Sequence, residues 1–347
     1  VSAATLLGGC GILSMQQLLQ PLSLYYAGCL GGGMLVFYVL LRSCLTYSKG
    51  YDLHRRFAAI FCVLGVCMAC LVMLDYAARW QEFLQVHTTL YLKYRNFATA
   101  LLLTTLPMSF YLSLKKPAHL LGVAVQAAGL ALTGSRSALL FGVALLGLGF
   151  VYLVRWGLIP RKAVLPLCVA GAVLAVLVGP ELLSLMMDSR MEDGHLFHQG
   201  DSVRVQLFLR GITDFLHNPV FGIGLISQRN SDLFTGVEGS MVFYHNSIAQ
   251  IMGSMGLVGI AAYGVLMRDR IALLRAGKTP FVRALALSYL GMLLISLTNP
   301  GEFCPFPNAA LMVMVFTLAE EAPGDVAVPV GEMLGLRPAR RIYLPQK

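Results

Sequence analysis

The chain has 347 residues, of which 57% are hydrophobic and only 12% are charged, and its mean hydropathy is +0.72. Soluble domains carry about a quarter of charged residues, so this composition excludes a water-soluble globule and indicates a membrane protein. The net charge of +9 fits short basic loops that orient membrane spans, and we do not expect nucleic acid as a partner.

Apolar stretches long enough to cross a bilayer as helices recur along the whole chain. We predict an all-α fold, a polytopic transmembrane helix bundle with about ten spans. The chain begins at Val1 rather than Met, so we expect a cut or processed N-terminus with spans missing before it. The predicted spans are residues 2–19, 21–41, 56–75, 95–114, 117–134, 137–154, 162–183, 244–267, 281–299 and 303–320.

Basic residues fall mostly in the loops on one side of these spans. With a cytoplasmic N-terminus, 18 of the 26 Lys and Arg residues lie on the cytoplasmic side, and 11 of the 17 acidic residues lie on the other. Short cytoplasmic loops are rich in Lys and Arg. We therefore expect both termini in the cytoplasm and residues 321–347 to form a cytoplasmic tail.

The ionisable residues of the spans lie at their outer ends, and almost none is predicted at mid-depth. Ion-coupled transporters place acids or bases near the bilayer centre. This distribution favours a site at the outer face over a transport pathway. The outer ends hold Asp75, Arg95, Arg136, Glu181 and His245.

Two arginines open predicted spans on the outer side. Arg136 follows Thr133-Gly-Ser135 and precedes Ser137. It is either an interface anchor or part of an anion site, because backbone N–H groups, the helix dipole and the guanidinium charge converge at such a helix start. Arg95, beside Asn96, is a weaker cationic candidate for substrate binding at the same level.

The loop 188–243, between the seventh and eighth spans, is far longer than the others and lies outside the cytoplasm. Long loops in compact proteins are commonly functional. Residues 202–217 are predicted to form a helix, because Asp201 and Ser202 are good N-caps and Asn218-Pro219 ends the run.

The two arginines of this helix receive different interpretations from a helical wheel. Arg204 lies within the apolar face, where its guanidinium requires an anion, either a structural carboxylate or a phosphate of a ligand. Arg210 shares the polar face with Asp214 and is predicted to be its solvated partner. We retain Arg210 as a substrate-binding candidate.

His245-Asn246-Ser247 opens the eighth span on the outer side. His245 is either a polar cap or a group that moves a proton near neutral pH. Asn246 is a substrate-binding candidate beside it. The small residues Ala249, Gly253, Gly256 and Gly259 then predict close helix packing.

A metal site is not expected. His195-Leu-Phe-His198, with Asp193, offers an incomplete ligand set without a convincing third partner. We predict no metal and no other cofactor.

Three segments of the chain carry recognisable motifs in a fixed order. They are Thr133–Ser137, Arg204–Leu225 with its His-Asn-Pro-Val-Phe-Gly-Ile-Gly stretch, and His245–Gly259. Together they resemble the O-antigen ligase and O-antigen polymerase group of polytopic polysaccharide enzymes. The similarity covers roughly residues 90–320, so we divide the chain into N-terminal spans (1–90), a ligase-like membrane domain (91–320) and the tail. Ser254 and Phe208 depart from the Glu and Trp that many members of the group carry.

The resemblance implies a metal-independent glycosyltransferase of the cell envelope. It would transfer a glycan from undecaprenyl pyrophosphate to a hydroxyl of a glycan, lipid or protein acceptor, at the outer face of a bacterial plasma (inner) membrane. Arg136 and Arg204 would bind the pyrophosphate, whose charge grows as it leaves, and His245 would act as the base. The alternative is a transporter or flippase of lipid-linked oligosaccharide.

Overall fold

A computed structural model describes residues 28–47, 53–86, 94–167, 199–225, 243–299 and 301–321, together with positions 90, 92, 169, 171, 173, 176 and 177. These residues form helices and connections, with no strand among them, so the predicted all-α fold is confirmed for this part of the chain.

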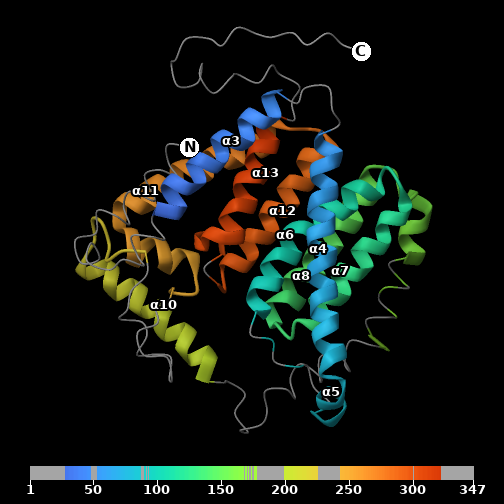
Figure 1. The fold of residues 1–347 in the computed structure, drawn as a ribbon, viewed down its shortest axis with the longest axis horizontal. Helices are drawn as coiled ribbons and strands as arrows, with labels where there is room; N and C mark the ends of the chain where they lie inside the picture. The colour runs from blue at the N-terminus through green and yellow to red at the C-terminus, as the bar shows by residue number, and fades with distance from the viewer. Residues whose placement is uncertain are drawn as a thin grey trace.

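The helices pack together as a bundle, and α10 and α11 lie at one side of it (Figure 1). In chain order the elements are η1 (Cys29–Gly33), α3 (Met34–Tyr47), α4 (Leu53–Ala78), α5 (Trp80–Val86), α6 (Arg95–Ser113), η2 (Pro117–His119), α7 (Leu120–Leu132), α8 (Arg136–Arg155), α10 (Gln199–His217), α11 (Ser247–Ala276), α12 (Pro280–Ser296), η4 (Gly301–Phe303), η5 (Pro305–Ala309) and α13 (Ala310–Glu321).

Four of the described helices are long and apolar enough to cross a membrane: Cys29–Tyr47, Leu53–Ala78, Arg136–Arg155 and Ser247–Ala276. Two shorter apolar helices, Pro117–Leu132 and Pro280–Ser296, also fall on predicted spans. The first predicted span, 2–19, lies outside the described residues, and a total of about ten spans stays a prediction.

The α6 helix forms the centre of the bundle, because every residue from Ala98 to Ser113 is buried. It packs against α4, α7, α8 and α12. Polar side chains join these helices: Thr105 Oγ1 donates to Gln126 Oε1 over 3.0 Å, and Gln126 Nε2 donates to Ser109 Oγ over 2.6 Å. Such pairs satisfy polar groups that lipid cannot.

Four helix ends meet at one end of this bundle. A pocket there is lined by His54 at the start of α4, Lys115 just after α6, Trp156 just after α8 and Phe281 at the start of α12. The His54 and Phe281 rings stack with centroids 4.5 Å apart. The starts of α6 and α8 and the end of α12 therefore share the opposite end, as the predicted alternation of spans requires.

A second contact joins two distant segments that the sequence predicts on the cytoplasmic side. Arg42 of α3 is buried and lies 3.1 Å from Glu320 and 3.0 Å from Glu321 at the end of α13. The Tyr38 hydroxyl donates to Glu320 over 2.9 Å. The ends of α3 and α13 are thus side by side, and their cytoplasmic location stays a prediction.

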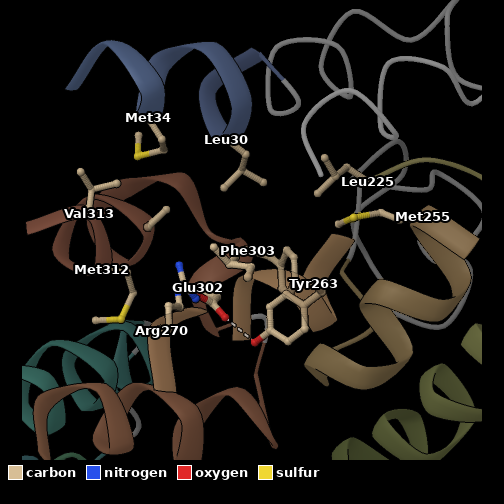
Figure 2. A pocket seen from close by; sticks show the side chains of 12 residues that line it. Leu30, Met34, Leu225, Met255, Tyr263, Arg270, Glu302, Phe303, Met312 and Val313 are labelled. Carbon is tan, nitrogen blue, oxygen red and sulfur yellow. Dashed lines mark hydrogen bonds and ion pairs between the residues drawn. The ribbon is translucent and has the colours of Figure 1, made fainter. Parts of the chain in front are cut away.

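The prediction that ionisable groups are nearly absent from the interior of the spans is wrong for Arg270 and Glu302. Arg270, predicted in a cytoplasmic loop, lies inside α11, which runs nine residues beyond its predicted end. Glu302 lies in η4, where the chain folds back after α12. Their side chains are 2.5 Å apart, and only 14% and 7% exposed. The paired groups lie beside an apolar pocket between α3, α11 and α13 (Figure 2).

Candidate functional site

The α10 helix lies directly against the first part of α11 because small residues face each other at the crossing. A Cβ atom built on Gly211 of α10 would lie 2.9 Å from the Ala249 Cβ and 3.1 Å from the Ala249 carbonyl oxygen. A Cβ on Gly253 would lie 2.9 Å from the Gly211 carbonyl oxygen. The predicted close packing through Ala249 and Gly253 is confirmed.

Gly256 interrupts α11, whereas its spacing predicts close packing against another helix. Its φ of +62° and ψ of −157° break α11 into two helical pieces. Only glycine adopts this backbone conformation readily. The carbonyl groups before the break and the N–H groups after it therefore lose their partners within the helix.

The loop that follows α10 supplies these missing partners. The N–H groups of Ile223 and Gly224 donate to the carbonyl oxygens of Gly253 and Ser254 over 2.9 and 3.0 Å. In return, the N–H groups of Leu257 and Val258 donate to Pro219 O and Val220 O over 2.7 and 3.2 Å. The Pro-Val-Phe-Gly-Ile-Gly stretch thus docks into the broken helix and fixes α10 relative to α11.

Asp214 provides a further link between the two helices. It is fully buried, and its Oδ2 accepts a hydrogen bond of 2.7 Å from the Tyr244 hydroxyl. The prediction that Asp214 lies on a solvated polar face with Arg210 is therefore wrong for Asp214. Leu207, Gly211 and Asp214 form the buried side of α10, whereas the apolar Val205 and Leu209 are exposed. The buried side of α10 differs from the predicted one because α10 meets α11 through the short Gly211 and not through its larger apolar residues.

Arg204 lies on the same side of α10 as Leu207 and Gly211 and is half-buried, as predicted. Its positive charge acts on His245, which lies immediately before α11, the helix that α10 packs against. The helix itself ends at His217 as predicted, and it begins at Gln199, three residues before the predicted start.

His245 has a strained backbone immediately before α11. Its φ of +53° makes it the one non-glycine residue with a positive φ in the described part of the chain. Such conformations persist only where surrounding contacts enforce them, and they cluster at functional sites. Burial, followed by the charge of Arg204, lowers the pKa of His245 to about 4, and a side-chain hydrogen bond with Asn299 opposes this shift. The imidazole is therefore neutral at pH 7, the protonation state that a base requires before it takes up a proton.

Asn246 acts as the N-cap of α11. Its Oδ1 accepts hydrogen bonds from the N–H groups of Ile248 and Ala249 over 2.9 and 3.1 Å. Its Nδ2 donates to Leu297 O, just after α12, over 2.9 Å. These contacts position the start of α11 against the end of α12. Substrate binding by Asn246 stays a prediction.

The remaining predicted cations lie at the same end of the bundle. Arg95 begins α6 and Arg136 begins α8, and both helices start at the end where α12 finishes and Asn246 is attached. Arg136 is exposed, Gly134 before it has a φ of +64°, and the Ser135 and Ser137 hydroxyls are 2.9 Å apart. Direct participation of Arg95, Arg136 and Arg210 in one site with His245 stays a prediction.

No group of three or more His, Cys, Asp or Glu side chains suited to a metal occurs among the residues that the structure describes. Asp193, His195 and His198 lie outside those residues.

Sequence inspection missed two residues next to His245. Tyr244 was not singled out because its partner, Asp214, is 30 residues away. Asn299 was not singled out because a polar residue at a span end is a common feature; the Asn299-Pro300 pair at the end of a span is the one local signal of an ordered turn.

Comparison with known proteins gives a family match that covers most of the residues described above. Residues 121–264 match the O-antigen ligase family. The matched region extends from α7 into α11 and includes Arg136, Arg204, Arg210, His245 and Asn246, whereas Arg95 and Asn299 lie outside it. The predicted resemblance to this group of enzymes is confirmed. No curated protein gives a significant match to the chain.

Proposed function

We propose that this protein transfers a glycan from undecaprenyl pyrophosphate to an acceptor hydroxyl, because residues 121–264 match the O-antigen ligase family. The observation that supports this most directly is the strained backbone of His245 at the start of α11, together with the charge of Arg204 from α10 that acts on it. A cation beside a base suits a reaction in which an anion leaves while a hydroxyl loses its proton.

In the proposed reaction, His245 accepts the proton of the acceptor hydroxyl. The acceptor oxygen then bonds to the anomeric carbon of the glycan, and the bond from that carbon to the pyrophosphate oxygen breaks. Undecaprenyl pyrophosphate leaves with the electron pair of the broken bond. Arg204 and Arg136 compensate its charge, so no metal is required.

The proposed location is the outer face of a bacterial plasma membrane. The distribution of Lys and Arg supports it, because the helix ends around His54 and Lys115 fall on the predicted cytoplasmic side, opposite the start of α11. Glycan, lipid and protein acceptors all offer the required hydroxyl.

The test is a transfer assay with purified protein in lipid. It contains undecaprenyl-pyrophosphate-linked oligosaccharide, a panel of acceptors and EDTA. We expect product from the wild type and none from His245→Ala or Arg204→Ala, each produced and inserted normally. His217→Ala is the matched control, since that histidine at the end of α10 is exposed and its Nδ1 hydrogen-bonds to Thr213 O within the same helix. Wild-type product from His245→Ala would refute the assignment of the base.

One observation favours the alternative of a transporter or flippase. Arg270 and Glu302 form a buried ion pair within the helix bundle, and intramembrane ionisable groups commonly mark transport pathways. The same vesicles distinguish the two functions: movement of the lipid-linked oligosaccharide across the bilayer without product would support transport. Loss of that movement in Glu302→Gln would assign it to this pair.

A further inference from the structure

The buried hydrogen bond between Tyr244 and Asp214 lies one residue from the proposed base. Tyr244 is 1% exposed and Asp214 is fully buried, so this bond is sheltered from water. The distance between the two oxygens is 2.7 Å, which is typical of a well-formed O–H···O hydrogen bond.

The backbone of Tyr244 is fixed as well. Its N–H group donates to Gln250 Oε1 over 3.0 Å, and Gln250 Nε2 donates to Leu225 O over 2.5 Å. Gln250 thereby connects the first turn of α11, the residue before His245 and the end of the docked loop. Because both the side chain and the backbone of Tyr244 are held, the next residue, His245, has little conformational freedom.

These contacts explain how His245 keeps a φ of +53°. That conformation costs of order 1–3 kcal/mol for a residue with a Cβ atom and persists only where its surroundings enforce it. The Asn246 cap holds the chain on one side of His245, and Tyr244 holds it on the other.

The same bond also sets the position of Arg204. Asp214 and Arg204 lie on one side of a continuous helix, ten residues apart, which corresponds to about 15 Å along the axis. The bond between Asp214 and Tyr244, together with the crossing at Gly211 and the loop after α10, therefore restricts how far the Arg204 end of α10 can move relative to His245.

We propose that Tyr244 and Asp214 are positioning residues that hold His245 and Arg204 in reactive geometry. This inference rests on the proposed function, because it assigns to the pair the alignment of that base with that cation. Neither residue needs to touch substrate. A misplacement of about 1 Å at a reactive group is enough to slow a reaction on the order of 100-fold.

The experiment compares Tyr244→Phe with Tyr263→Phe in the full-length protein. Each substitution removes one tyrosine hydroxyl that donates to a buried acidic side chain. Tyr244, just before α11, donates to Asp214, and Tyr263, within α11, donates to Glu302. Only Tyr244 adjoins His245. We expect Tyr244→Phe to lower kcat at least about tenfold while the KM for the lipid-linked oligosaccharide stays within about twofold. Tyr263→Phe should keep the wild-type kcat.

A second measurement does not depend on turnover. The rate at which diethyl pyrocarbonate modifies His245, followed by mass spectrometry well below the unfolding temperature, should rise in Tyr244→Phe and not in Tyr263→Phe. Asp214→Leu, which has a similar size but no acceptor oxygen, should reproduce the effect, and the double variant should be no worse than either single one, since both lose the same bond.

The outcomes separate this inference from the proposed function. Equal effects of Tyr244→Phe and Tyr263→Phe on kcat and on His245 modification would overturn the positioning role and leave the bond a purely stabilising one. Faster modification in Tyr244→Phe, in a protein whose wild type transfers nothing, would refute the proposed function and support the positioning of His245.

Discussion

Gly253 offers the sharpest test of the α10–α11 contact. In Gly253→Ala the new Cβ would lie 2.9 Å from the Gly211 carbonyl oxygen, 2.9 Å from Tyr244 Cζ and 3.0 Å from Gly211 Cα. Carbon atoms pack favourably at about 3.5–4.0 Å, so the helices must separate by roughly 0.5–1 Å. Two of the three contacts are backbone atoms, which cannot turn aside as a flexible side chain would.

The expected cost follows from this geometry. Overpacking of a tight contact destabilises by about 1–3 kcal/mol. The separation also moves Arg204 away from His245, which we expect to reduce transfer on the order of 100-fold. Thermal unfolding in detergent and the transfer assay measure the two effects.

Gly264→Ala is the matched control on the same helix, because a Cβ at Gly264 meets nothing within 4 Å. It should unfold at or above the wild-type temperature, since alanine favours a helix over glycine by about 1 kcal/mol. If Gly253→Ala were as stable and as active as Gly264→Ala, the close crossing of α10 and α11 would be refuted.

Two further predictions concern charges. Because the pKa of His245 is lowered to about 4 and a base must be neutral to act, wild-type kcat/KM should stay level from pH 7 down to about pH 5 and fall as the pH approaches that pKa. Arg204→Gln removes a positive charge that lowers the pKa of His245, so the pH at which modification of His245 by diethyl pyrocarbonate is half-maximal should rise, still below 6.5 because burial remains; an unchanged pH dependence would contradict the Arg204–His245 proximity. Glu302→Gln should lower the free energy of unfolding by about 3–5 kcal/mol, because it leaves Arg270 buried without its counter-charge. Adding Arg270→Met should restore much of that loss in thermal unfolding, and a fully stable Glu302→Gln protein would show that the pair contributes little.

Properties that depend on neighbours in the sequence were predicted well. The helices α4 and α8 match their predicted spans to within a few residues, because a run of apolar side chains is a local property. The end of α10 at His217 was predictable for the same reason, since Asn218-Pro219 cannot continue a helix.

Properties that depend on distant partners were predicted less well. Nothing near Asp214 indicates that a tyrosine 30 residues later would bury it. The break at Gly256 is stabilised only because Pro219, Val220, Ile223 and Gly224 supply hydrogen bonds from another segment. A glycine-rich helix and a broken one have the same local pattern.

The sequence by itself determined that the chain is helical, that it holds apolar segments long enough to cross a membrane, and that its motifs are similar to those of the O-antigen ligase family, because hydropathy and short motifs depend on consecutive residues. Only the tertiary structure decided which side of α10 meets α11, that the charge of Arg204 acts on His245, and that Arg270 and Glu302 pair inside the bundle. The reason is physical: burial and pairing depend on which surfaces come together, and a small residue such as Gly211 can determine that contact more strongly than the larger apolar residues around it.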